Sequence, residues 1–192
     1  MLFRSVLGDL RCVTFERTAP TNQPGAWRRQ AHQGGTLFDV AVHQLDLVTW
    51  TTGLSMTEVI AFTHPDRRAG LPDETVSITG RLGERCVANI RASRELPYGK
   101  NDLIIEGTRG MLSTSALRWV DEFSVQVKDA SGVNEIRFKP VTTYRREVEV
   151  FADEVRGRRS LLPDGSEGVA MVRLVAAILE SIQTGQIVRV EG

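Results

Sequence analysis

This sequence of 192 residues lacks an excess of positive charge, a set of paired cysteines and long apolar runs. Its 24 Lys and Arg side chains are balanced by 24 Asp and Glu, whereas nucleic-acid binding needs clustered positive charge that releases counterions from phosphates. No apolar run approaches the roughly 18 residues that cross a bilayer, and the segment after Met1 is too short for a signal peptide. We therefore expect a cytoplasmic protein with no nucleic-acid or membrane partner.

Cysteine is too scarce for a disulfide framework or a metal cluster. The two cysteines, Cys12 and Cys86, lie in apolar, strand-like segments, and we expect both side chains to be small and buried. The hydrophobic share of 41% and the charged share of 25% are typical of a globular protein. A chain of this length fits one domain over residues 1–192 with a sizeable core.

Hydrophobic spacing predicts both helices and strands. Apolar residues at three- and four-residue intervals predict helices at 36–52 and 144–156 and a third carrying Val169 to Leu179. Alternation with a period of two predicts strands at 10–17, 75–82, 86–92, 103–113 (a hairpin), 123–128, 133–138 and 187–190. The pattern predicts an α+β fold, with a large, mainly antiparallel open β-sheet and helices packed on one face.

The densest group of reactive side chains lies on the first predicted helix. Asp39, His43 and Asp46 are four and three residues apart, which places them on or near one helical face. A carboxylate there can hold an imidazole in one tautomer, as a general acid/base pair requires. The spacing also fits an acid that stabilises the helix N-terminus, or two carboxylates and one histidine that contribute to a metal site.

Other polar, aromatic and glycine-rich segments are less specific. His32 and His64 lie among turn-forming residues, the arginine pairs 67–68 and 145–146 fit solvated surfaces, and Trp27, Trp50 and Trp119 fit either a sugar site or the edge of a core. The Gly-x-x-Gly segments at 80–83 and 107–110 lie between strands rather than at a strand-to-helix turn. The chain therefore has no dinucleotide-binding motif, and we expect it to bind no cofactor by itself.

Residues 34–46, GGTLFDVAVHQLD, resemble a motif of the Gfo/Idh/MocA oxidoreductases, which include glucose-fructose oxidoreductases and inositol dehydrogenases. Residues 105–112, IEGTRGML, are similar to the strand-turn-strand of that family, Ser181 to Gly185 to the end of its last helix, and residues 7–10, LGDL, to the point where its second domain begins. Thr36 and Ala41 stand where the family often has glycine. The resemblance covers essentially the whole chain in the family's order.

The resemblance implies the C-terminal, substrate-binding and dimerisation domain of a two-domain enzyme without its N-terminal Rossmann domain. His43 and Asp39 would then be catalytic, while Asp46 and Trp27 would bind a sugar or polyol substrate. NAD or NADP is implied for the full-length enzyme, and hydride transfer is not expected from this chain alone. The resemblance also implies a homodimer formed through the open face of the sheet.

Two further hypotheses stay open at this point. The chain could be a non-catalytic binding or dimerisation module that retains the fold. It could also be a metal-dependent enzyme that uses Asp39, His43 and Asp46.

Overall fold

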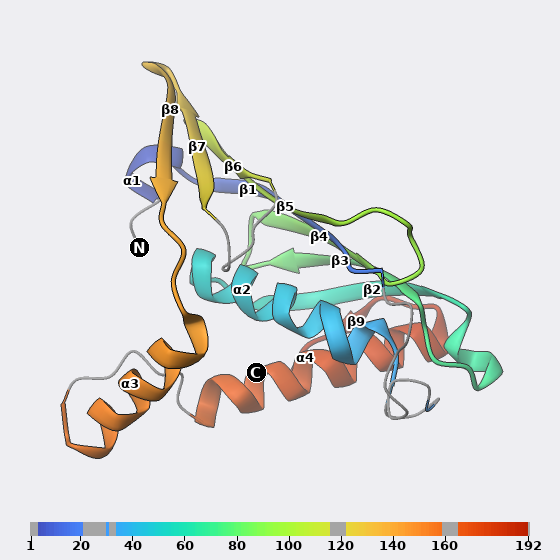
Figure 1. Ribbon diagram of the computed structural model, residues 1–192. Coiled ribbons are helices and arrows are strands. Elements are labelled where there is room, and N and C mark those ends of the chain that lie inside the picture. Colours follow the sequence, from blue (N-terminus) through green and yellow to red (C-terminus); the bar gives the residue numbers. More distant parts are fainter. Residues whose placement is uncertain (1–3, 21–29, 31–33, 116–121, 159–164, 192) are drawn as a thin grey trace.

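The computed structural model describes residues 4–20, 30, 34–115, 122–158 and 165–191 (Figure 1). Its helices are α1 (Arg4–Leu7), α2 (Val42–Thr52), α3 (Thr143–Val155) and α4 (Gly165–Thr184), with a π-helical turn η2 (Leu37–Ala41) and a 3-10 turn η3 (Arg67–Ala69). Its strands are β1 (Leu10–Thr18), β2 (Met56–His64), β3 (Thr75–Leu82), β4 (Cys86–Ser93), β5 (Lys100–Gly107), β6 (Gly110–Thr114), β7 (Phe123–Asp129), β8 (Gly132–Phe138) and β9 (Val188–Arg189).

The strands form one sheet in the order β8-β7-β6-β5-β1-β4-β3-β2-β9. All neighbours are antiparallel except β1 and β4, which run parallel from the pair Cys12 and Val87 to the pair Thr18 and Ser93. The α+β class and the mainly antiparallel open sheet are thus confirmed.

Helices α2 and α4 pack on one face of this sheet (Figure 1). Leu45 of α2 and Ile178 of α4 are fully buried there, together with Val13, Ile78 and Ile90 from the central strands. Burying side chains of this kind stabilises a fold by about 1.5–3 kcal/mol each. None of the described helices is both long and apolar enough to cross a membrane.

Strand β2 and the parallel pairing of β1 with β4 were not predicted. In β2 the buried Val59 and Ala61 alternate with Ile60 and Phe62, so apolar residues occur on both faces and hide the period of two. A bulge at the start of the strand interrupts the alternation further. His64, expected in a loop, is the exposed last residue of this strand.

Two expectations about single side chains are wrong. Cys86 is buried, and burial raises the pKa of its thiol to about 11, but Cys12 is only partly buried. Arg67 was expected on a solvated surface, yet its side chain is 8% exposed and forms an ion pair with the fully buried Asp73. Arg68, by contrast, is exposed and pairs with the exposed Asp66.

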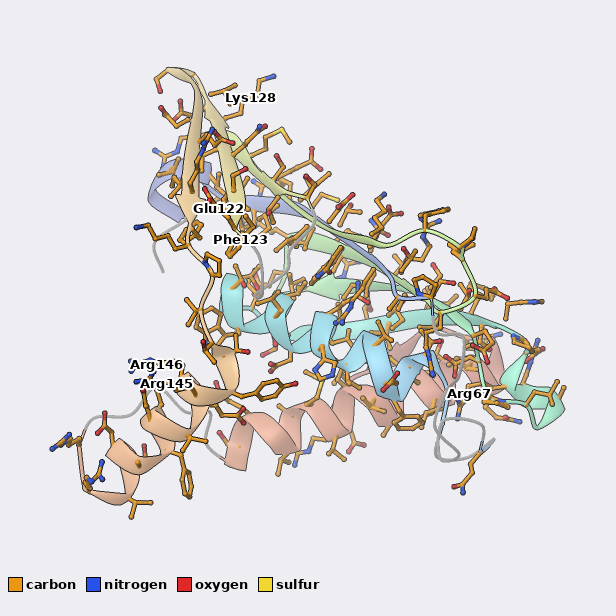
Figure 2. The ribbon with its side chains drawn as sticks, viewed as in Figure 1. Arg67, Glu122, Phe123, Lys128, Arg145 and Arg146 are labelled. Carbon is orange, nitrogen blue, oxygen red and sulfur yellow. The ribbon has the colours of Figure 1, made fainter. Side chains whose placement is uncertain are left out.

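Helix α3 lies apart from the sheet. Its apolar stripe includes Val148, Phe151 and Val155, which are 67%, 59% and 71% exposed, and none of its residues is buried. Figure 2 shows Arg145 and Arg146 of this helix at the end of the molecule opposite Arg67. The basic residues of α3 are therefore remote from the point where α2 begins.

The segments behind the family resemblance make defined tertiary contacts. The main-chain N–H of Asp9 donates to Thr108 Oγ1 at 3.1 Å, so the LGDL segment is joined to the turn between β5 and β6. The buried Ser181 accepts a hydrogen bond from Ala61 N at 3.1 Å and donates to Gln186 O at 2.7 Å. The end of α4 is thereby fixed to β2.

Candidate functional site

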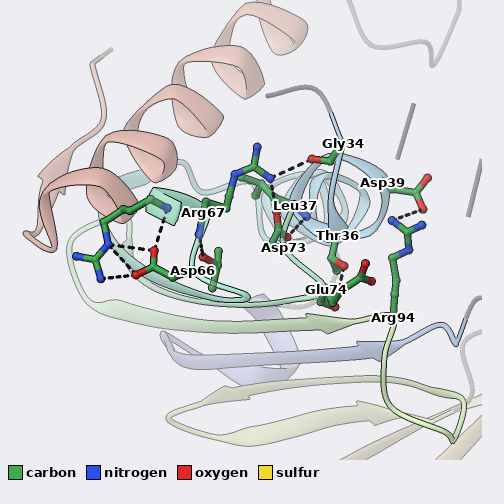
Figure 3. A network of polar contacts seen from close by, with 11 residues as sticks. Gly34, Thr36, Leu37, Asp39, Asp66, Arg67, Asp73, Glu74 and Arg94 are labelled. Carbon is green, nitrogen blue, oxygen red and sulfur yellow. Dashed lines mark hydrogen bonds and ion pairs between the residues drawn. The ribbon is translucent and has the colours of Figure 1, made fainter. Parts of the chain in front are cut away.

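The candidate site lies where the chain enters helix α2, beside the carboxyl ends of β1 and β4. Thr18 and Ser93 are paired at these strand ends, and the next residue of β4's chain, Arg94, donates its main-chain N–H to Glu74 O at 2.9 Å. Thr36, just before the helical segment, donates its hydroxyl to the same carbonyl at 2.8 Å. One carbonyl group therefore holds both the end of β4 and the entry to the helix (Figure 3).

Asp73 caps this helical entry from the start of β3. Its Oδ2 accepts a hydrogen bond from Leu37 N at 2.8 Å, and its main-chain oxygen accepts one from Thr36 N at 2.9 Å. Arg67 pairs with the Asp73 carboxylate and donates to Gly34 O at 3.0 Å. These contacts satisfy the first N–H groups of the helical segment, which have no partner inside it.

Gly35 allows Asp73 to come this close. Its φ of 99° lies in a region that residues with a Cβ rarely adopt, and a Cβ added to it would lie 2.2 Å from Asp73 Oδ1. The glycine that the motif provides at this position is therefore required by both conformation and space.

Asp39 lies in the π-helical turn that follows. Its carboxylate is 18% exposed and forms an ion pair with Arg94 at 3.6 Å, while the Arg94 side chain is only 2% exposed. Arg17, near the end of β1, is also close to Asp39: burial lowers the pKa of its guanidinium below the usual value, and the Asp39 charge opposes that shift. Asp39 is thus the acid that offsets the charge of two arginines.

His43 lies in the first turn of α2, four residues after Asp39, and its side chain is exposed. The next residue, Gln44, is fully buried and donates from Nε2 to Phe15 O of β1 at 3.1 Å and to Arg91 O of β4 at 3.3 Å. Gln44 therefore joins the helix to the parallel pair of strands. The imidazole is presented to the outside from a firmly held backbone.

Asp46 lies one turn further along α2, with its side chain exposed. It lines a groove of about 440 Å³ between α2, α4 and the chain end after β9, together with Trp50, which is 72% exposed, and Met171. Of the two interpretations given for Trp50, the edge of the core is therefore wrong. Asp39 and His43 are not among the residues that line this groove.

Trp27, His32 and Trp119 lie outside the described residues. The substrate-binding role predicted for Trp27 therefore stays a prediction. Among the residues that the structure describes, no group of three or more His, Cys, Asp and Glu side chains could hold a metal ion.

Sequence reasoning did not identify Arg94, Arg17, Gln44 and Asp73. Arg94 and Asp73 lie just outside the predicted strands, in segments that resemble polar loops. Gln44 is a polar residue within an amphipathic helix, and only the tertiary structure shows that it faces the sheet. An arginine directly after the buried residues Ala92 and Ser93 is the one sequence feature that could have suggested a buried partner.

The structure is thus an α+β domain, with an open sheet, helices on one face, and an acid and a histidine where the first of these helices begins. The family model described as the oxidoreductase family, C-terminal alpha/beta domain, matches residues 1–191. The chain belongs to this family, the Gfo/Idh/MocA family, as its motifs indicated.

Curated relatives are similar over much of this chain. A 1,5-anhydro-D-fructose reductase of Ensifer adhaerens is 21% identical over 172 residues, which are 86% of this chain and 51% of the relative. An inositol 2-dehydrogenase of Rhizobium meliloti (strain 1021) is 22% identical over 187 residues, or 92% of this chain and 55% of the relative. The chain therefore spans about half the length of these relatives.

Solved structures share the fold. A levoglucosan dehydrogenase in complex with NADH and levoglucosan superposes with a TM-score of 0.81 and 21% identity, covering 98% of this chain and 61% of that one. An aldose-aldose oxidoreductase from Caulobacter crescentus in complex with glycerol gives a TM-score of 0.80 at 17% identity, covering 98% and 58%. At these identities the likeness establishes the architecture.

Proposed function

We propose that this chain is the substrate-binding and dimerisation part of an NAD(P)-dependent oxidoreductase that acts on a hydroxyl group of a sugar or polyol. The observation that carries the proposal is the exposed imidazole of His43 four residues after Asp39, a carboxylate held by a buried arginine. The names of the curated relatives, a sugar reductase and an inositol dehydrogenase, support the substrate class.

The chemistry assigned to this chain is proton transfer. His43 would accept the proton of the substrate hydroxyl through an imidazole nitrogen during oxidation and return it to the carbonyl oxygen during reduction. Asp39 would orient the imidazole and stabilise its charged form. Asp46 and Trp27 are proposed to bind substrate hydroxyl groups and the apolar face of the substrate.

The start of the helical segment after Gly34 and Gly35 does not fit the phosphate groups of a nicotinamide dinucleotide. Phosphate groups bind at helix N-termini because free N–H groups and a positive dipole face them. Here the Leu37 N–H already donates to Asp73, whose fully buried carboxylate occupies that position. We propose that the cofactor is held by a separate dinucleotide-binding domain, and that residues 1–192 form one domain beside it.

The function is tested by joining this chain to the dinucleotide-binding half of a family relative. We expect the joined protein to reduce NAD or NADP in the presence of a sugar or polyol, measured by the absorbance of the reduced nicotinamide. The chain alone should show no binding of NADH or NADPH in calorimetry. Joined protein that folds, binds dinucleotide and turns over none of a panel of aldoses, cyclitols and anhydrosugars would favour the non-catalytic module.

We expect the chain to form a homodimer through the open face of the sheet, opposite α2 and α4. This face carries small polar residues such as Ser77 and Thr79, together with Phe62, which is 65% exposed. A stable interface of this kind buries on the order of 1,600 Å². Sedimentation at micromolar concentration should therefore give a dimer, and Phe62→Arg should give a monomer.

A matched variant distinguishes this surface from the apolar stripe of α3. Val148 on α3 is 67% exposed, nearly as much as Phe62, so Val148→Arg introduces the same charge at a similarly exposed position. It should leave the dimer intact. If the dimer persists in Phe62→Arg and dissociates in Val148→Arg, the interface is formed by α3 instead of the sheet.

A further inference from the structure

We propose that Arg94 is a positioning residue of this site, which holds the Asp39 carboxylate in place for His43 without touching the substrate itself. The inference rests on the proposed function, because it assigns Arg94 a role in the same proton transfer. It adds a residue from the end of β4 to a site that the sequence motif places entirely on the helix.

Burial separates Arg94 from any substrate. Its side chain is 2% exposed, whereas that of Asp39 is 18% exposed. Asp39 is thus the more exposed member of the ion pair, and it lies four residues, about one helical turn, before His43. A buried guanidinium requires an opposite charge, because an unpaired buried ion is strongly unfavourable.

The guanidinium is held from a rigid position. The Arg94 main chain donates to Glu74 O, and the same oxygen accepts the Thr36 hydroxyl that starts the helical segment. The side chain of Arg94 therefore spans two segments that are already fixed to each other. The Nε and Nη2 atoms of Arg94 have no hydrogen-bond partner among the described residues. Within these residues, its ion pair is the one that Nη1 forms with Asp39.

The π-helical turn gives this contact its importance. A π-helix is rare, usually limited to a single turn, and often found at functional sites. Asp39 is the central residue of the five in η2, and α2 with His43 follows immediately. An ion pair from Arg94 to this turn stabilises the backbone on which the spacing of Asp39 and His43 depends.

The groups that face Asp39 favour this assignment. Arg17 approaches it from β1, and Arg94 approaches it from the end of β4. Both arginines come from the sheet side, whereas Asp39 and His43 belong to the helical segment, so the Asp39 carboxylate joins this segment to the sheet. Its removal would leave Arg94 without its carboxylate partner.

The test is a double-variant comparison in the joined enzyme. Arg94→Lys keeps the charge but shortens the reach and loses the planar geometry, so we expect kcat to fall by about 10²-fold, the usual cost of misplacing a group by about 1 Å. KM for the sugar or polyol should change little, because the substrate does not contact Arg94. In an Asp39→Asn background the same change should lower kcat no further.

A second measurement uses the chain without a cofactor domain and so does not depend on the proposed function. The melting temperature of Arg94→Met with Asp39→Asn should fall by clearly less than the sum of the two single decreases, because the two residues interact. Arg91→Met is the control: it removes an arginine of β4, paired with Glu16 at 3.0 Å and 42% exposed, and its decrease in melting temperature should add to that of Asp39→Asn.

Three outcomes would overturn the proposal. Additive decreases in melting temperature would show that Arg94 and Asp39 do not interact. A KM increase that persists in the Asp39→Asn background would make Arg94 a substrate-binding residue. A loss of kcat that merely follows the folded fraction would make it a structural one.

Discussion

The His43→Ala variant of the joined enzyme should turn over substrate about 10²- to 10⁴-fold more slowly than the wild type, the usual contribution of a positioned general acid/base. The loss should appear in kcat and in kcat/KM alike, because the imidazole acts mainly in the transition state. Steady-state kinetics with a saturating nicotinamide cofactor measure it.

The same variant should fold like the wild type. His43 is exposed, and exposed substitutions usually change the free energy of unfolding by less than about 0.5 kcal/mol. Thr51→Ala is the control, because Thr51 lies on the same helix eight residues later, is partly exposed and does not line the groove beside Asp46. Equal effects of the two substitutions on kcat, or wild-type turnover of His43→Ala, would remove His43 from the reaction.

The Asp73→Ala variant should lose about 3–5 kcal/mol of the free energy of unfolding, the usual cost of breaking a buried ion pair by removing one partner. The substitution leaves the guanidinium of Arg67, 8% exposed, without its carboxylate and removes the acceptor of the Leu37 N–H. Urea unfolding followed by circular dichroism measures the change.

Two variants show which part of the Asp73 contact matters. Asp73→Asn keeps an acceptor for Leu37 N and removes only the charge that faces Arg67, so it should cost less than Asp73→Ala. Asp66→Ala removes the partner of the exposed Arg68 side chain and the acceptor of the Arg68 main-chain N–H, and should cost clearly less stability than Asp73→Ala. Equal stability of Asp73→Ala and Asp66→Ala would contradict the role of Asp73 at the helix entry.

Most of the secondary structure could be predicted because the apolar residues recur with the period of a strand or of a helix. The alternation at 75–82 coincides with β3, and the helical spacing at 36–52 matches η2 and α2 together, ending at Gly53. The π-helical turn could not be predicted, since the apolar spacing of Leu37, Val40 and Ala41 also fits an α-helix.

The site was only partly predictable for a physical reason. Asp39, His43 and Asp46 are close in sequence, and helix geometry alone places them on neighbouring turns. Arg94 and Asp73 reach the same region from 55 and 34 residues further along the chain than Asp39, through the folding of the sheet. Contacts at such separations follow from strand order, which no local pattern specifies.

The position of β1 in the sheet has a consequence for the order in which the protein folds. Strands β2, β3 and β4 form one set of antiparallel neighbours and strands β5 to β8 another, and β1 lies between the two sets. Cys12 pairs with Val87 and also with Glu106, so β1 leaves the ribosome long before either of its partners exists. Each flanking set can form from contacts between strands close in sequence, whereas the central pairing must wait for chain closure over a long loop. The strand of this sheet that comes first along the chain is therefore among the last to be enclosed.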